Sequence, residues 1–245
     1  MAKLKLRDRI SGTAGLSWAI AREAGASLLT YELYPLGLVG KLPVVHPPWG
    51  KDSRPKIPIL FIHGIFHNRS AFAWLAQRLA FSGFRNFKEL NLLTSIHRIP
   101  RMAEQTGEQV QKLLKKYDVP QVDIIAHSMG GIIARYFIQN GGGDGKVRHL
   151  ITLGTPHQGT RLSDYSVLPH FKDLSPDSAT LIELNRNPVP NHTQGLAISG
   201  DLDIFMQPRQ CGLWKGVRNV ELKSVGHAGL LFSRRVLQLI TSRLQ

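Results

Sequence analysis

Short apolar runs alternate along this chain with segments whose apolar residues recur every three or four positions. Runs that are apolar almost throughout are typical of strands buried on both faces of a parallel sheet, because neither face meets water. Proline or glycine bounds several of these runs, as expected at strand ends. Strands are predicted at 57–62, 84–93, 122–126, 147–153, 195–199 and 217–222.

The segments between these runs show the periodicity of amphipathic helices. Val110, Leu113, Leu114 and Tyr117, for example, lie at positions i, i+3, i+4 and i+7. Alternating strands and helices predict an α/β fold, here a mostly parallel, doubly wound sheet with helices on both faces. Helices are predicted from Asn68 or Ser70 to Gly83, between Pro100 and Pro120, at 129–140 and at 228–244.

The chain divides into an N-terminal arm and one larger domain. Residues 1–54 form a basic arm followed by a proline-rich connector, and residues 55–245 hold all the predicted strands. No strong strand pattern appears at 160–193. This stretch is therefore expected to form a small lid or flap rather than a full cap domain.

The arm is too polar for a membrane-spanning helix and does not resemble a typical secretory signal. Small polar residues interrupt the apolar run at 10–21, and Arg22 and Glu23 follow at once. The arm is expected either to rest on an anionic membrane surface or to pack on the domain. Packing is favoured because several large side chains would be costly to leave in water: Trp18, Leu28, Leu29, Tyr31, Leu33 and Tyr34.

The chain is strongly basic, with 31 Lys and Arg against 17 Asp and Glu and a net charge of +14. Such a charge attracts anionic partners such as phospholipid surfaces or nucleic acid. No nucleic-acid-binding module accompanies it, so membrane contact is expected and nucleic acid is not. Cys211, the single cysteine, is interpreted as a buried apolar residue. The protein is expected to be cytoplasmic or peripherally membrane-associated, and export is also compatible. The sequence does not indicate an oligomeric state.

The most informative segment runs from Asp123 to Ile133, where a predicted strand meets a predicted helix at Ala126-His127-Ser128-Met129-Gly130. Joining them through small-x-Ser-x-Gly requires a very tight turn that presents the serine hydroxyl at the carboxyl end of the sheet. Serine is also a common helix N-cap. A cap explains neither the flanking residues nor the glycine pair, so Ser128 is interpreted as a nucleophile.

A second loop follows the first predicted strand at His63-Gly64-Ile65. A developing oxyanion is stabilised by backbone N–H groups that point at it, and the expected donors are those of Ile65 and Met129. Hydrolases with such an elbow place nucleophile, acid and base in that order along the chain. His63 precedes Ser128, so it is interpreted as a structural residue that holds this loop.

The remaining catalytic groups are sought after Ser128. His227 lies between the last predicted strand and the closing helix, which is the position expected for the base. Either Asp203 or Asp201 could be the acid, since both follow the predicted strand at 195–199. Lone histidines in surface loops are expected at His46, His67, His97, His149, His170 and His192.

From Ile57 to Leu244 the chain resembles the lipase and esterase branch of the α/β hydrolases, and in particular the small, nearly lidless Bacillus-type lipases. The resemblance is carried by an elbow that begins with Ala126, by the His63-Gly64-Ile65 start and by the ending Val225-Gly226-His227-Ala228-Gly229. It implies Ser128 as nucleophile, Asp203 as acid and His227 as base, with Ile65 and Met129 as oxyanion donors. The arm before Pro55 has no counterpart in those lipases.

The resemblance implies a lipase or esterase that cleaves carboxylic esters of lipid-like or apolar acyl substrates. No metal or organic cofactor is expected, because the sequence shows no zinc-like ligand spacing. An acyltransferase, a thioesterase or a polyester hydrolase would use the same residues. A non-catalytic membrane-surface binding protein on this fold is the alternative from another class.

Overall fold

A computed structural model describes residues 13–38, 40, 43–47, 57–166, 169–187 and 192–245. Its centre is a six-stranded sheet in the order β2-β1-β3-β4-β5-β6, in which every neighbouring pair is parallel. The predicted α/β fold with a parallel sheet is therefore confirmed. The strands are β1 (Ile59–Ile62), β2 (Phe87–Leu90), β3 (Val122–His127), β4 (Val147–Leu153), β5 (Gln194–Gly200) and β6 (Arg218–Leu222).

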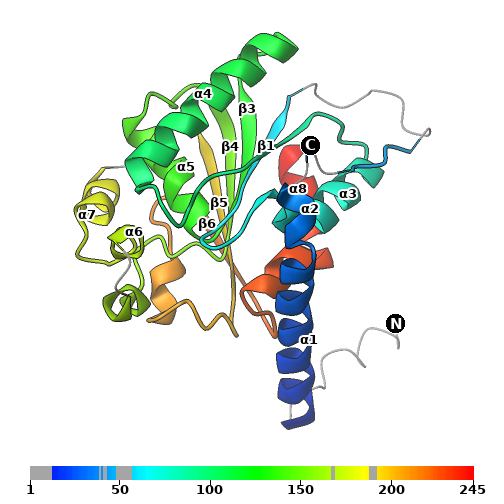
Figure 1. Cartoon of the computed structure of the whole chain (residues 1–245), viewed down its shortest axis with the longest axis vertical. Helices are drawn as coiled ribbons and strands as arrows, with labels where there is room; N and C mark the ends of the chain where they lie inside the picture. Colours follow the sequence, from blue (N-terminus) through cyan, green and yellow to red (C-terminus); the bar gives the residue numbers. More distant parts are fainter. Residues whose placement is uncertain (1–12, 39, 41–42, 48–56, 167–168, 188–191) are drawn as a thin grey trace.

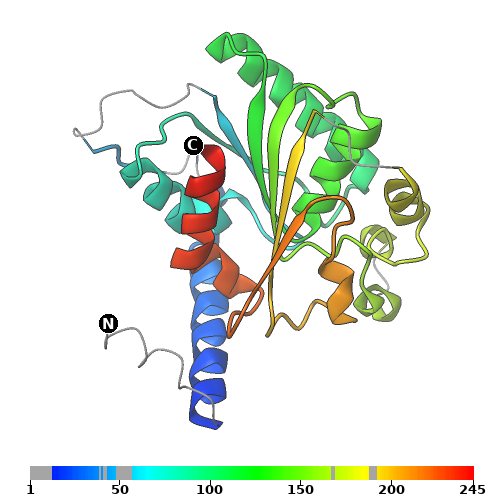
Figure 2. The ribbon, with the colours of Figure 1, turned by 180° about the vertical axis from the view of Figure 1, so that it is seen from behind.

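Helices cover both faces of this sheet. Figure 1 shows α4 and α5 on one side and α3 and α8 on the other, and Figure 2 shows the second side from behind. The α-helices are α1 (Thr13–Glu32), α2 (Tyr34–Leu38), α3 (Ala73–Phe81), α4 (Ile99–Tyr117), α5 (Met129–Asn140), α6 (Pro169–Lys172), α7 (Ala179–Arg186) and α8 (Arg234–Leu244). Short 3-10 helices are η1 (Arg69–Phe72), η2 (Arg161–Tyr165), η3 (Arg209–Gly212) and η4 (Ala228–Phe232).

Each face of the sheet has its own hydrophobic core. Ile124 of β3 packs in the cluster that contains Val110 and Ile132, whereas its neighbour Ile125 packs with Leu79 and Ile240. Successive side chains of a strand point to opposite faces, so both must be apolar when both faces are covered. This explains why the strand sequences are continuous apolar runs.

Two predicted elements are shorter than expected. The strand predicted at 84–93 is limited to 87–90, because β2 is an edge strand that pairs only with the four residues of β1. The closing helix predicted at 228–244 is divided into η4 and α8. Ser233 lies between them in an extended conformation, and its side chain accepts a hydrogen bond from the N–H of Val236, which caps α8.

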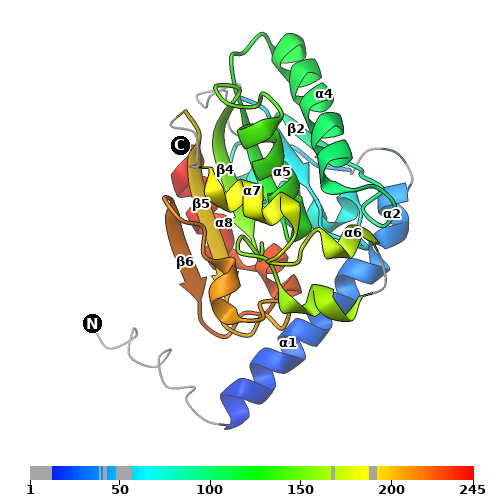
Figure 3. The same cartoon turned by 90° about the vertical axis from the view of Figure 1, so that its left-hand side faces the viewer.

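The described part of the N-terminal arm forms α1 and α2, and α1 packs against η4. The basic residues Lys3 to Arg9 and most of the proline-rich connector lie outside the described residues. In Figure 3, α1 runs along one edge of the domain and its first turns project beyond it. Among the described residues, no helix has both the length and the apolar character needed to cross a bilayer.

The expectation that large apolar residues of the arm would be buried is wrong for four of them. Small residues make the contact instead, since Ala19 is 3% exposed and Thr30 2%. Large apolar residues lie on several sides of α1, but the domain covers only one side of the helix. Exposed side chains include Leu16, Trp18, Ile20, Leu28, Leu29 and Tyr31.

Within the predicted flap, α7 is held to α5 by a buried arginine. Arg135 of α5 is 2% exposed and donates hydrogen bonds to the carbonyl oxygens of His157 and Leu184 and to the side chains of Gln139 and Asn185. Its guanidinium also lies 5.3 Å from the ring centre of Trp214. Burial lowers the pKa of Arg135 to about 9, so the group stays charged at neutral pH.

We expect Arg135→Lys to lower the free energy of unfolding by roughly 2–4 kcal/mol, because one ammonium cannot reach all of these acceptors and leaves some of them, such as the His157 carbonyl, without this donor. Urea unfolding measures the change. The control is Arg186→Lys on the exposed side of α7, for which less than about 0.5 kcal/mol is expected. Equal effects of the two substitutions would contradict this role of Arg135.

Candidate active site

The predicted site residues come together at the carboxyl edge of the sheet. Ser128 follows β3, Asp203 follows β5 and His227 follows β6, while Ile65 follows β1. The parallel register aligns these strand ends, with Ile62 opposite Ala126, for example. Ligands and reacting groups in open parallel sheets lie at this edge, because the loops after the strands converge there.

Ser128 has a strained backbone, with φ 55° and ψ −129°. Its N–H donates to the carbonyl of Leu153 at 2.8 Å, which attaches the turn to β4. Although Ser128 occupies the N-cap position of α5, its side chain makes no capping hydrogen bond. The N-cap interpretation therefore does not account for the Ser128 hydroxyl.

Glycines make this turn possible. A Cβ at Gly130 would lie 2.7 Å from the carbonyl oxygen of His63 and closer still to that of Ile62. A Cβ at Gly64 would lie 2.7 Å from the Cβ of Ser128. The β1 loop and the elbow therefore touch backbone to backbone, which requires glycine on each side.

His227 and Asp203 form a direct pair. The Nδ1 of His227 lies 2.7 Å from Oδ2 of Asp203, whose side chain is fully buried. The other oxygen of Asp203 accepts the N–H of Phe205 at 2.9 Å. Asp201 instead accepts the N–H groups of Ser224 and Val225. Of the two candidate acids, only Asp203 contacts His227.

Two rings flank His227. The rings of His127 and Phe205 lie 4.5 Å and 4.7 Å from it, centre to centre. His127 Nε2 lies 3.2 Å from the carbonyl oxygen of His227, so this nitrogen is the donor. Burial holds the pKa of His127 well below its ordinary value, with a smaller effect from the neighbouring His227. His127 is therefore neutral and ties the elbow to the turn that carries His227.

The loop after β1 is held by His63. Its Nδ1 lies 2.9 Å from the carbonyl oxygen of Gly64, and its Nε2 accepts the N–H of Leu92 at 3.0 Å. Both contacts fit one neutral tautomer, with the proton on Nδ1. Burial lowers the pKa of His63 to about 4. His63 thus fixes the backbone next to Ile65, while Met129 begins α5, where the first N–H groups have no acceptor within the helix.

The site faces a largely apolar pocket of about 300 Å³. One wall comes from α1, through Glu23, Ser27, Thr30 and Tyr31, a contribution that the sequence did not reveal. The remaining walls include Ile65, Phe66, His67, His127, Ser128, Phe171, Ile204, Phe205, His227 and Leu231.

Two histidines expected in surface loops have other surroundings. His149 lies in β4, is 7% exposed and contacts Asp123 at 3.0 Å. His67 lines the pocket and stacks on the ring of Tyr31, with 5.9 Å between ring centres. His149 falls within the strand predicted at 147–153, so its place in the sheet could have been inferred from the sequence. The surroundings of His67 come from the distant helix α1 and had no such signal.

Cys211 is buried, as predicted, and its sulfur lies 3.4 Å from that of Met206. Burial raises the pKa of the Cys211 thiol to about 12, so it is protonated at neutral pH. Among the described residues, no group of three or more His, Cys, Asp or Glu side chains is arranged to hold a metal ion.

The parallel sheet, the elbow and the two loops give this chain an α/β-hydrolase fold, which it shares with solved lipase structures. The mature form of lipase BlEst2 from Bacillus licheniformis superposes with a TM-score of 0.68 at 16% identity, covering 83% of this chain and 96% of that one. Aspergillus fumigatus lipase B gives a TM-score of 0.70 at 15% identity, covering 83% of this chain and 55% of that one.

Residues 45–175, more than half of the chain, match the family described as domain of unknown function DUF7379, and the chain belongs to that family. A segment of 72 residues of this chain is 38% identical in sequence to part of triacylglycerol lipase 2 of Saccharomyces cerevisiae. That match covers 29% of this chain and only 22% of the yeast protein.

The buried neutral histidines make stability depend on pH. For His63 the pKa is about 4 in the folded state and 6.5 ordinarily, so between these values the unfolded chain binds a proton that the folded chain does not. Stability must therefore fall as pH falls from 6.5 towards 4, and His127 and His157 act in the same direction.

We expect His63 alone to remove about 2.5 kcal/mol between neutral pH and about pH 4.5. Urea unfolding at the two pH values measures the loss. His63→Gln does not titrate in this range and keeps an acceptor for Leu92, so its stability should depend less on pH than that of the wild type. Identical pH dependence in the two proteins would contradict the assignment.

Proposed function

We propose that the protein is a serine hydrolase that cleaves carboxylic esters of apolar acyl substrates through an acyl-enzyme on Ser128. The observation that carries this proposal is the strained Ser128 backbone beside the pocket that His227 also lines, with His227 bonded to Asp203 at 2.7 Å. A structural serine has no need of a costly positive φ, whereas a nucleophile gains exposure from it.

In the proposed mechanism, His227 removes the proton of Ser128 while the serine oxygen attacks the ester carbonyl. Asp203 holds the imidazole through Nδ1 and stabilises its charge once the proton has moved. His227 then protonates the departing alcohol, leaving the acyl group on Ser128. Water, activated by the same histidine, releases the acid and restores the serine.

The tetrahedral intermediate places a negative charge on the former carbonyl oxygen. We assign its stabilisation to the backbone N–H groups of Ile65 and Met129. A donor of this kind contributes about 3 kcal/mol to the transition state. The hydrogen bonds of His63 with Gly64 and Leu92 hold the loop that carries the Ile65 N–H group.

The preference for an apolar acyl group rests on the pocket lining, in which Ile65, Phe171 and Leu231 lie with several other apolar side chains. Proteins of similar fold that are named lipases support the same substrate class. An acyltransferase, a thioesterase or a polyester hydrolase would use the same groups and differ only in the acceptor or the leaving group.

We expect Ser128→Ala to abolish hydrolysis of p-nitrophenyl esters and labelling by a fluorophosphonate, while the thermal unfolding midpoint stays close to that of the wild type. Asp203→Asn should lower kcat by roughly 10⁴-fold, because the wrong histidine tautomer is then favoured. Asp201→Asn is the comparison two residues away: it keeps an oxygen that can accept the N–H groups of Ser224 and Val225, so its loss should be less than about tenfold. Full activity of Ser128→Ala would refute the mechanism, and a binding protein would show no turnover in the wild type.

We propose further that residues 55–245 form the hydrolase domain, with 160–193 as a small flap, and that the arm attaches the protein peripherally to anionic membranes. The exposed apolar side of α1 supports this proposal, since Trp18 and Leu28 are 62% and 61% exposed. The net charge of +14 favours an anionic surface. A helix of this kind binds by burying its apolar side chains at the headgroup boundary.

We expect the protein to sediment with vesicles that contain anionic phosphatidylglycerol more than with vesicles of phosphatidylcholine alone. Replacing both Trp18 and Leu28 by Ser should weaken binding at least about tenfold, because each buried side chain contributes about 1.5–3 kcal/mol. Ile182→Ser in α7, an exposed apolar residue outside the arm, is the control. Equal binding to both vesicle types would argue against the proposal.

A further inference from the structure

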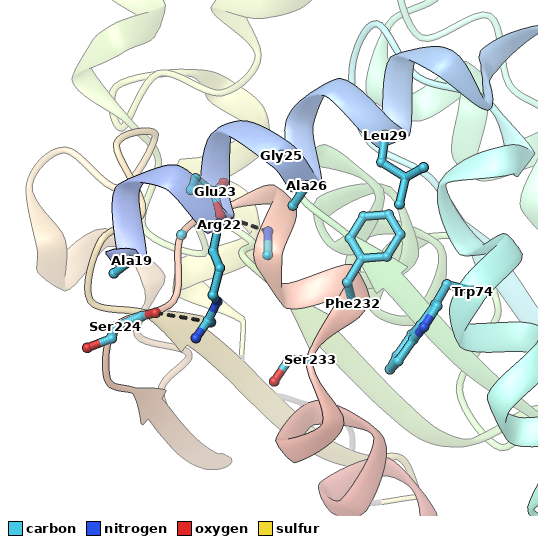
Figure 4. Close-up of a pocket in the computed structure, with 12 residues that line it drawn as sticks. Ala19, Arg22, Glu23, Gly25, Ala26, Leu29, Trp74, Ser224, Phe232 and Ser233 are labelled. Carbon is cyan, nitrogen blue, oxygen red and sulfur yellow. Dashed lines mark hydrogen bonds between the residues drawn. The ribbon is translucent and has the colours of Figure 1, made fainter. Parts of the chain in front are cut away.

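Helix α1 reaches the active site through one carboxylate. Oε1 of Glu23 accepts the N–H of Ala228 at 2.6 Å, and Oε2 accepts the N–H of Gly229 at 2.9 Å. These two residues directly follow His227 in the chain. Figure 4 shows Glu23 pointing from α1 towards this turn, with a dashed line marking a hydrogen bond. Both oxygens of the carboxylate are thus engaged by the backbone next to His227.

The turn is shaped to receive this carboxylate. A Cβ at Gly229 would lie 2.7 Å from Oε2 of Glu23, and a Cβ at Gly226 would overlap the same carboxyl group. Neither glycine has a positive φ, so the absence of a side chain matters here for space rather than for backbone conformation. The glycines on either side of His227 and Ala228 are explained by the approach of Glu23.

Further contacts of α1 hold the same segment. Arg22 donates to the carbonyl oxygen of Ser224 at 3.3 Å, three residues before His227. Leu29 points towards the ring of Phe232 at the end of η4 (Figure 4). The helix therefore contacts the chain before His227, directly after it and at the end of η4.

Two carboxylates hold the two ends of the His227 turn. Asp201 accepts the N–H groups of Ser224 and Val225 before the histidine, and Glu23 accepts those of the two residues after it. Asp203 orients the ring itself. The carboxylate that holds the backbone after His227 thus comes from Glu23 of the N-terminal helix α1.

We propose that Glu23 is a positioning residue for His227, so that docking of α1 completes the active site. This inference rests on the proposed function, in which His227 is the base. A base must lie within hydrogen-bond reach of the proton that it takes, and a displacement of about 1 Å costs on the order of 100-fold in rate. Glu23 prevents this displacement by holding the backbone rather than by contacting the reacting atoms.

We expect Glu23→Ala to lower kcat for a p-nitrophenyl ester by about 10- to 100-fold and to change KM less than about twofold. Glu23→Gln keeps one oxygen acceptor and should recover part of the loss, leaving a decrease of about 3- to 10-fold. Glu32→Ala removes an exposed carboxylate from the same helix and is the matched control, with kcat unchanged. If Glu23→Ala does not fold, the kcat of Glu23→Gln is compared with that of Glu32→Gln, and only the former should be lower than that of the wild type.

Hydrogen exchange of the amides of Ala228 and Gly229 provides a readout independent of catalysis. In Glu23→Ala these amides should exchange faster than in the wild type, while those of β3 remain protected. The inference is overturned if Glu23 variants keep the kcat of the Glu32 controls, or if their loss appears in KM alone. A wild-type protein without Ser128-dependent turnover would instead overturn the proposed function, which separates the two failures.

Discussion

The backbone of Ser128 is the constraint on which the rest of the site depends. A positive φ at a serine costs about 1–3 kcal/mol and persists only where the surroundings enforce it. Here β3 leads into the turn, α5 leads out of it, and the Ser128 N–H is bonded to β4. Gly64 and Gly130 allow the β1 loop to lie directly against the elbow. The parallel register of the strands and both glycines therefore help to fix the position of the Ser128 hydroxyl.

The histidines near this turn have different roles because their surroundings differ. His63 and His127 are buried, and burial lowers the pKa of each, so they act as neutral donors and acceptors that hold loops together. His227 lies at the pocket and has a buried carboxylate as its partner. A buried neutral ring is suited to structure, and a ring paired with a carboxylate is suited to proton transfer.

The elbow, the order of the site residues and five of the six strands could be predicted closely from the sequence, because each depends on a local pattern. The choice between Asp201 and Asp203 depends on which carboxylate points at His227, and two residues of spacing do not decide that. The α1 wall had no comparable signal, since Glu23 meets its partners across more than 200 residues. Burial of Trp18 was expected from its size, but the narrow contact of α1 is made by small residues such as Ala19.

The hydrogen bonds of Glu23 join positions that are 205 and 206 residues apart in the chain. During synthesis, α1 therefore emerges from the ribosome long before Ala228 and Gly229, whose N–H groups donate to Glu23, have been made. Contacts of such large sequence separation form late, because the intervening chain must first be ordered. The core that contains Ile124 includes no residue of the His227 turn, so it can form while that turn is still open. The core on the other face includes Val225 and Leu231, so it is completed only together with the active site. Until then the apolar side chains of α1 stay exposed, so a chaperone or a lipid surface can bind them.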